Sequence, residues 1–211
     1  MYQPPHFRED RLEVQHALVR AHPLGLLVTY GKTGLAANPI PFMLDEEASQ
    51  LGTLRGHLSR ANPQWRDFDP ALEALVVFQG TQTYITPSWY EAKRAHGKVV
   101  PTWNYAIVQA YGTLRVIDDP AWLLNQVSAM TSLREATRPE PWAVSDAPSD
   151  FLDAQLKGII GVEIEIARIE GKWKVSQNRP QADRKGVVAG LREDGGEPAL
   201  QMADLVETRG I

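Results

Sequence analysis

The sequence contains no cysteine among its 211 residues. This absence excludes disulfide bonds, thiolate metal sites and cysteine nucleophiles, and it gives no sign of an oxidising compartment. No apolar run reaches the about 20 residues that a membrane-spanning helix needs. The first ten residues, MYQPPHFRED, also lack the basic start and apolar stretch of a signal peptide. We therefore expect a cytoplasmic protein that does not enter a membrane.

Several motifs that mark common enzyme classes are missing. The sequence has no GxGxxG, GxxxxGK[ST], GxSxG or HExxH pattern. Its five histidines are scattered, and no two lie four residues apart on an expected helix, so we expect no metal site. They are His6, His16, His22, His57 and His96. No catalytic residue can be assigned from the sequence.

Positive charge is also in short supply. The chain has 22 Lys and Arg against 26 Asp and Glu, a net charge of −4. Such a molecule repels nucleic acid as a whole, although a local basic stretch can still bind a phosphate. No helix-turn-helix with a basic recognition helix is visible, so we do not expect direct nucleic-acid binding.

What is present fits a soluble globular protein. Hydrophobic residues make up 43% and charged residues 23% of the chain, and the length suits one substantial domain. We expect a single domain over residues 1–211.

The hydrophobic pattern favours β-strands. Period-two alternation is clearest after position 105, where the even-numbered residues are apolar or small. Pro39 and Pro41 cannot donate to a ladder, so their strand should be bulged or at an edge. The expected strands cover residues 25–30, 35–44, 51–58, 74–80, 106–117 and 161–169, the last with residues 170–177 as its hairpin partner.

Helices are expected at the start, middle and end of the chain. Residues 8–20, 118–136 and 147–159 show helical spacing, with Ser149 as a cap, and the tail from Arg179 is helical with an interruption at 195–198. Residues 91–98 look like a mobile connection. Strands in hairpin order with separate helices argue for an antiparallel barrel, and against a doubly wound sheet. Helical segments at about 118–160 and 179–208 should pack on this barrel.

A polar loop follows the third expected strand. In GHLSRANPQ (56–64), a cation, a hydroxyl, an amide and free backbone N–H groups lie within a few residues, which are the groups that a phosphate needs. In that interpretation the Arg60 guanidinium donates two parallel hydrogen bonds to the phosphate, and the Ser59 hydroxyl and the backbone N–H groups bind the remaining oxygens. The alternative is structural: His57 and Asn62 cap the turn and Arg60 is solvated.

Aromatic residues concentrate in YITPSWY (84–90) and PTWNY (101–105). Their rings could stack on a planar heterocycle whose edge Thr102 or Asn104 would meet. An aromatic core or a subunit interface would need the same residues. The segment GKWKVSQNR (171–179) is polar and basic, and it could meet a ligand or a partner subunit.

Taken in order, six segments resemble the PaiB-like family of FMN-binding negative transcriptional regulators. The resemblance runs from Met1 to about Leu191 and includes the spacing between the segments. The segments are MYQPPHF, AANPIPF, GHLSRANPQW, VVFQGTQTYITPSWY, VVPTWNYAIVQAYG and GKWKVSQNR.

The resemblance implies a split β-barrel of the FMN-binding type, mainly β with flanking helices, that forms a homodimer with FMN at the interface. It also implies that the FMN phosphate is bound by His57, Ser59, Arg60 and Asn62. The strand that contains Ala37 and Asn38 would run beside the isoalloxazine ring of FMN. The other subunit would complete the isoalloxazine site. Candidates for that role are Trp103, Asn104 and Tyr105, or Ser176, Gln177 and Asn178.

Three functional hypotheses follow. The first is a dimeric FMN-binding protein with a negative regulatory role in transcription, as the family name implies. The second is a flavin-dependent oxidoreductase that takes hydride from a nicotinamide and passes electrons to a small molecule. The third is a module that binds haem or another planar ligand, or that binds only a partner protein.

Overall fold

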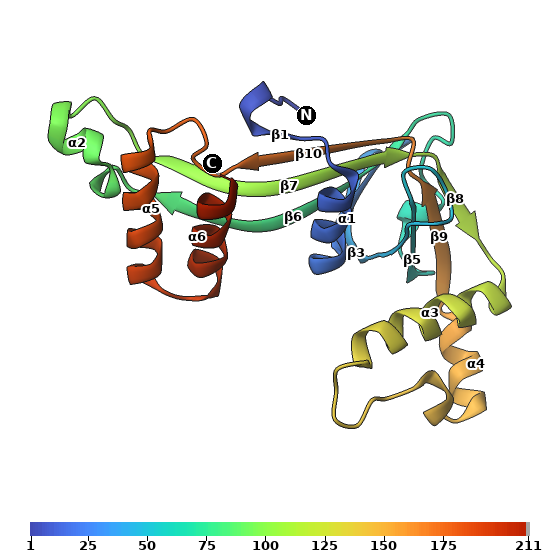
Figure 1. Cartoon of the computed structure of the whole chain (residues 1–211). Helices are drawn as coiled ribbons and strands as arrows, with labels where there is room; N and C mark the ends of the chain where they lie inside the picture. Colours follow the sequence, from blue (N-terminus) through green and yellow to red (C-terminus); the bar gives the residue numbers. More distant parts are fainter. Residues whose placement is uncertain (210–211) are drawn as a thin grey trace. The chain divides into compact units, whose positions relative to one another are not determined.

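The computed structural model describes residues 1–209, which contain ten strands, six α-helices and four short 3-10 helices (Figure 1). The strands are β1 (Arg8–Glu9), β2 (Leu24–Gly31), β3 (Gly34–Pro41), β4 (Met43–Asp45), β5 (Thr53–Ser59), β6 (Ala74–Ile85), β7 (Thr102–Gly112), β8 (Leu114–Ile117), β9 (Ile159–Glu165) and β10 (Arg168–Lys174). The helices are η1 (Pro5–Phe7), α1 (Leu12–Ala21), η2 (Pro63–Trp65), η3 (Pro87–Trp89), α2 (Glu91–His96), α3 (Pro120–Glu135), η4 (Val144–Asp146), α4 (Ser149–Lys157), α5 (Gln181–Asp194) and α6 (Glu197–Arg209).

The strands form two antiparallel sheets, with the orders β1-β10-β7-β6-β2-β3 and β4-β5-β9-β8. This confirms the prediction of antiparallel strands with added helices. Strand β3 lies at the end of its sheet, as expected because Pro39 and Pro41 have no N–H to donate. Within residues 1–209 the two sheets do not close into a barrel.

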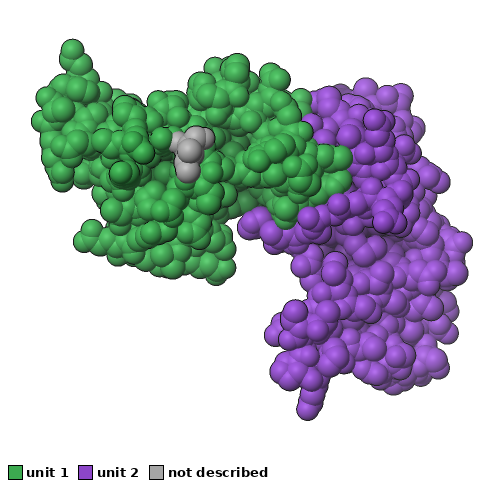
Figure 2. Space-filling view, viewed as in Figure 1, with its two compact units in different colours: residues 1–18, 79–109, 170–211 green, residues 19–78, 110–169 purple. Residues whose placement is uncertain are grey.

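The chain divides into two compact units, coloured separately in Figure 2. Unit 1 comprises Met1–Leu18, Gln79–Gln109 and Glu170–Ile211, and unit 2 comprises Val19–Phe78 and Ala110–Ile169. The expectation of one domain over residues 1–211 stays a prediction.

In unit 2, the β2–β3 hairpin is in register from Leu24↔Pro41 to Gly31↔Gly34. Its turn is held by Asp67, whose carboxylate accepts hydrogen bonds from Lys32 N at 2.8 Å and Thr33 N at 3.2 Å. Gly34 has a φ of 100°, a left-handed conformation that favours glycine. The hairpin is therefore fixed at both its register and its turn.

Strand β5 lies between β4 and β9 in the second sheet of unit 2. Leu54 and Leu58 are buried, whereas Arg55, His57 and Ser59 alternate with them and are half-buried or exposed. Because successive side chains of a strand point to opposite faces, β5 holds the core with one face and presents His57 and Ser59 on the other.

In unit 1, α5 packs very closely on η3. A Cβ added at Gly186 would lie 1.9 Å from Trp89 O, and one added at Gly190 would lie 2.2 Å from Trp89 Nε1. Only glycine permits this approach. The helices α5 and α6 lie side by side in Figure 1 and are joined through Gly195 and Gly196, with φ values of 70° and 80°.

One predicted pairing is wrong. Residues 161–169 and 170–177 were expected to form a hairpin, but β9 and β10 belong to different sheets. After Glu165 the chain leaves its sheet: Ile166 N donates to Gly52 O at 3.0 Å and Ala167 N donates to Tyr111 O at 2.9 Å. Strand β9 already has β5 and β8 on its two sides, so it offers no edge to β10.

Several predicted boundaries also need correction. The first helix begins at Leu12 and not at residue 8, because Arg8–Glu9 pair with β10. The segment 91–98 was expected to be a mobile connection, but Glu91–His96 form α2. Ser149 does not cap α4; it is the first helical residue, and the cap position is Pro148. The buried even-numbered positions of β7, among them Ala106 and Val108, confirm the period-two prediction. The expected strands 35–44 and 106–117 are each broken in two, and their second parts, β4 and β8, belong to the other sheet.

Candidate functional site

A cavity of about 690 Å³ lies in unit 2 beside β3, β5 and the turn from α4 to β9. Four of the twelve predicted site residues line it: Asn38 on β3, His57 and Ser59 on β5, and Asn62 in the loop that follows. The remaining wall is mostly apolar or backbone. It is made by Pro39, Ile40, Pro41, Leu58, Ala154, Gln155, Gly158 and Ile159.

The buried side chain of Gln64 orients Asn38. Gln64 is 2% exposed, and its Nε2 donates to Leu27 O at 3.0 Å and to Ala36 O at 3.3 Å. Backbone carbonyls can only accept, so these contacts leave Gln64 Oε1 to accept from Asn38 Nδ2, at 2.9 Å. Asn38 Oδ1 is thereby left as an acceptor.

Gln64 also orients Asn62, but here the oxygen of the asparagine amide is bound and its nitrogen is left free. Asn62 caps η2, and its Oδ1 accepts from the backbone N–H of Gln64 at 3.0 Å. Asn62 Nδ2 is thereby left as a donor. The neighbouring exposed Ser59 adds a hydroxyl, and its Oγ accepts from Ala61 N at 3.3 Å. The loop therefore offers hydrogen-bond donors, whereas Asn38 offers an acceptor.

His57 is held from behind by α3. Its Nδ1 lies 2.8 Å from Oε1 of Gln126, a residue that is 3% exposed. With Gln126 accepting through Oε1, the proton of this hydrogen bond lies on His57 Nδ1. Gln126 Nε2 is buried without a partner among residues 1–209.

Arg60 links the loop after β5 to Asp118 and to the end of α4, and we call its pairing with Asp118 the Arg60–Asp118 clamp. Its guanidinium makes two hydrogen bonds to Asp118, of 2.8 and 2.6 Å, and its Nε donates to Lys157 O at 3.0 Å. The hydrogen bonds from Arg60 lower the pKa of Asp118, and the same contact raises the pKa of Arg60. Arg60 does not line the cavity directly. The bidentate fork expected for a phosphate is used here for a carboxylate, and a phosphate role of Arg60 stays a prediction.

Ala37 lies on β3 next to Asn38 and is exposed, and its side chain is not part of the cavity wall. The other six predicted residues belong to unit 1. The structure brings two of them together, because Asn104 Nδ2 donates to Ser176 Oγ at 2.9 Å. Asn104 is 1% exposed, so it cannot present its amide at the surface. Asn178 is exposed.

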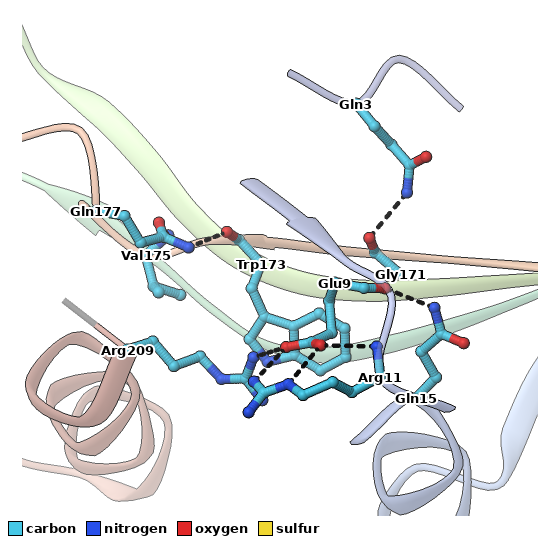
Figure 3. Close-up of polar contacts among 9 residues, drawn as sticks. All are labelled: Gln3, Glu9, Arg11, Gln15, Gly171, Trp173, Val175, Gln177 and Arg209. Carbon is cyan, nitrogen blue, oxygen red and sulfur yellow. Dashed lines mark hydrogen bonds and ion pairs between the residues drawn. The ribbon is translucent and has the colours of Figure 1, made fainter. Parts of the chain in front are cut away.

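Gln177 serves the backbone of β10. Its Nε2 donates to Trp173 O at 2.6 Å and its Oε1 accepts from Val175 N at 2.8 Å (Figure 3). Both ends of this amide are occupied. One donor and one acceptor position of the amide remain, so a contact of Gln177 with the flavin ring stays a prediction.

The aromatic residues of unit 1 are partly exposed. Trp103 is 49% and Tyr84 48% exposed, and their rings meet edge to face with centroids 6.1 Å apart. Burial, together with the nearby charges of Lys172 and Arg179, lowers the pKa of Lys174. Its Nζ donates to Trp103 O at 2.5 Å. The Nζ atom of the buried Lys172 lies 5.4 Å from the centroid of Tyr105.

Figure 3 also shows a polar cluster that ties α6 to β1 in unit 1. Glu9 is 5% exposed and accepts hydrogen bonds from Arg11 Nε at 2.8 Å, Arg11 N at 3.0 Å and Arg209. Burial would raise the pKa of Glu9, but these hydrogen bonds outweigh it and lower the pKa to about 2. Arg209 also lies 4.7 Å above the centroid of the Trp173 ring.

Sequence reasoning missed Gln64 and Gln126. Gln64 follows Pro63 directly after the loop, and its place in the quoted motif GHLSRANPQ was a usable signal. Gln126 lies 69 residues after its partner His57, and no local pattern marks it. In the described part of the chain, no three His, Cys, Asp or Glu side chains are placed to hold a metal ion. Among residues 1–209 no helix combines the length and apolar character needed to span a membrane.

The chain is similar to solved structures in fold. It resembles the flavocytochrome Anf3 from Azotobacter vinelandii, with a TM-score of 0.56 and 13% identity, over 79% of this chain and 69% of that one. It resembles the FAD and haem binding protein from Mycobacterium smegmatis, with a TM-score of 0.54 and 17% identity, over 78% and 71% of the two chains.

Relatives at the level of sequence cover nearly the whole chain. A protein of Emericella nidulans without an assigned function is 37% identical over 237 residues, covering 96% of this chain and 94% of its own. The protease synthase and sporulation protein PAI 2 of Bacillus subtilis is 31% identical over 209 residues, covering 99% and 98%. The model of the family described as "Putative FMN-binding domain" matches residues 1–168. The chain therefore belongs to this FMN-binding family, of which PAI 2 is a full-length relative.

Proposed function

We propose that the protein binds FMN in the cavity of unit 2, within a split-barrel homodimer. The observation that carries this proposal is the convergence of Asn38, His57, Ser59 and Asn62, from three segments of the chain, on one cavity. A volume of about 690 Å³ lies in the range typical of ligand sites. The flavoprotein names of the solved structures with similar folds support the split-barrel part of the proposal.

The donor set fits a phosphorylated flavin. Asn62 Nδ2 and the Ser59 hydroxyl can donate to phosphate oxygens, and Gly158 has no side chain that would block access from the opposite wall. Asn38 Oδ1 can accept from a hydroxyl of the ribityl chain or from a ring N–H. When bound, FMN would supply a redox-active ring; these residues would fix its position.

The homodimer is proposed from unit 1. Trp103 and Tyr84 expose about half of their surface, and Val100 is 65% exposed. Exposed apolar groups of this size often mark interfaces. Trp103 and Tyr105 are the proposed contacts with the partner subunit or with its flavin, whereas the buried Asn104 supports their strand from inside.

We further propose a regulatory role in transcription, supported by the sporulation-linked name of the PAI 2 relative. The net charge of −4 favours an indirect role, in which the flavoprotein does not itself bind DNA. A gel shift at stated salt concentration would test this. A shifted band that persists at about 0.15 M salt would contradict the indirect role.

The second candidate function is a flavin-dependent oxidoreductase. It is favoured by the flavocytochrome among the similar folds. Anaerobic mixing of the FMN-loaded protein with NADH or NADPH would bleach the flavin absorbance if this function holds. If neither nicotinamide bleaches the flavin, the oxidoreductase function is contradicted and the proposal of FMN binding with a regulatory role remains.

The absorbance spectrum after reconstitution tests the cofactor itself. We expect FMN to give a stoichiometric flavin spectrum that survives gel filtration, and haem to give no complex. A protein that retains haem but not FMN would support the third hypothesis. Failure to retain FMN at micromolar concentration would contradict both flavin-dependent functions.

A further inference from the structure

His57 borders a second cavity of about 300 Å³ in unit 2. One face of α3 forms most of its wall through Val127, Met130 and Arg134, which lie at the three- and four-residue spacing of a single helix face. Thr131, Glu135 and Trp142 complete it. None of these six residues lines the cavity proposed for FMN.

The apolar part of this cavity suits a planar ligand. Val127 and Met130 are half-buried and form an apolar wall, and methionine adapts readily to flat aromatic surfaces. Trp142 is 48% exposed although it is a large aromatic residue. Its backbone is not loose, because Trp142 N donates to Glu135 Oε2 at 3.2 Å. The backbone of Trp142 is therefore fixed at the edge of the cavity, and its half-exposed indole is available for stacking.

The two charges of the cavity differ in their partners. Glu135 already uses its carboxylate to hold the Trp142 backbone. The Arg134 side chain makes no hydrogen bond or ion pair within residues 1–209, so its planar guanidinium has all its donors available. A carboxylate is the group that such a fork binds with two parallel hydrogen bonds.

We propose that this cavity is a second binding site, which takes a planar aromatic carboxylate stacked on Trp142 with its carboxylate on Arg134. The shared wall at His57 places this ligand next to the flavin, a relation that rests on the proposed function. The ligand would therefore be a substrate or an effector of the flavin site. Its class is defined by an aromatic ring system with one anionic end.

Three matched naphthalene probes test the proposal by isothermal titration of the full-length protein. These are 2-naphthoate, the neutral 2-naphthalenemethanol and the cationic 2-naphthylmethylammonium. We expect 2-naphthoate to bind at least about fivefold more tightly than either of the others, because only its carboxylate can accept charge-assisted hydrogen bonds from Arg134; fivefold corresponds to about 1 kcal/mol. Equal affinities, or tighter binding of the cation through Glu135, would overturn the proposal.

Variants then locate the binding. Arg134→Gln should weaken 2-naphthoate about fivefold and leave 2-naphthalenemethanol unchanged. Arg138→Gln is the matched control, because Arg138 is exposed near the end of α3 and does not line the cavity. Trp142→Ala should weaken all three probes, with folding checked by circular dichroism. Equal effects of the two arginine variants would overturn the assignment to Arg134.

The same titrations separate this proposal from the proposed function. They are run on FMN-free protein and repeated after FMN is added. Naphthoate binding without FMN binding would leave the second site standing and contradict the flavin site. FMN binding without selectivity for 2-naphthoate would support the flavin site and contradict the second site.

Discussion

Gln64 Oε1 accepts a hydrogen bond from Asn38 Nδ2 at 2.9 Å, and this contact leaves Asn38 Oδ1 as the atom available to a ligand in the cavity. The direction is imposed by backbone carbonyls of β2 and β3, which occupy the donor end of Gln64. A buried amide that touches no ligand thus sets the chemistry of a cavity wall. Such an amide is costly to leave unsatisfied.

Gln64→Met keeps the size of the side chain and removes its hydrogen bonds. We expect the free energy of unfolding to fall by about 2 kcal/mol and the FMN dissociation constant to rise about tenfold, because Asn38 is no longer oriented. Urea unfolding and flavin fluorescence titration measure the two effects.

Gln50→Met is the matched control for this variant. Gln50 is exposed, does not line the cavity, and has no side-chain hydrogen bond in residues 1–209. Its replacement should change stability and FMN affinity little. If both glutamine variants behave alike, Gln64 has no positioning role.

The Arg60–Asp118 clamp holds the loop that carries Ser59 and Asn62. Arg60→Gln and Asp118→Asn should each lower the melting temperature modestly, and the double variant should lose no more than the larger single loss. Because the clamp lowers the pKa of Asp118, its stabilisation is present above the usual aspartate pKa and is lost as pH falls. Additive losses in the double variant would show that the two residues act separately.

The Glu9–Arg209 contact anchors the last helix of unit 1 to β1. With a pKa lowered from 4.5 to about 2, Glu9 stabilises the fold fully above about pH 4.5, and this contribution disappears as pH falls from there through about 2. Glu9→Gln should therefore cost about 2 kcal/mol near neutral pH, after discounting for the exposed Arg11, and much less at about pH 3. A cost that is independent of pH would mean that the charge of Glu9 is irrelevant.

Trp103 and Tyr84 form the exposed aromatic pair that we assign to the subunit interface. Trp103→Glu places a charge there and should shift the sedimentation coefficient from that of a dimer to that of a monomer. Tyr2→Glu is the control, since Tyr2 is 81% exposed and outside the pair. A variant that stays dimeric would place the interface elsewhere.

The sequence predicted the local elements of this fold better than their partners. Apolar runs bounded by turn residues, together with period-two alternation, located most of the strands, and Pro39 and Pro41 correctly indicated an edge. The β9–β10 hairpin failed because alternation describes the two faces of a strand but not its neighbours. The backbone contacts of Ile166 and Ala167, which take the chain from one sheet to the other, are long-range and have no sequence signal.

The site shows the same division. Asn38, His57, Ser59 and Asn62 were predicted and do line one cavity, because β3 and β5 lie in contact and Asn62 follows β5 after a short loop. Arg60 pairs with Asp118, which lies 58 positions away in the sequence. The sequence therefore predicted a cation in the loop but not the carboxylate that binds it. Gln64 and Gln126 were missed because a glutamine becomes a positioning residue only when burial and a distant partner make it one.

The most direct test of the flavin site compares FMN with riboflavin, which lacks the phosphate, in the wild type and in Ser59→Asp. The new carboxylate would face the phosphate in the cavity, so FMN affinity should fall by more than about tenfold while riboflavin affinity stays within about threefold. Flavin fluorescence titration at constant salt gives both values. An equal loss for the two ligands, or no loss for either, would contradict the placement of the FMN phosphate beside Ser59 and Asn62.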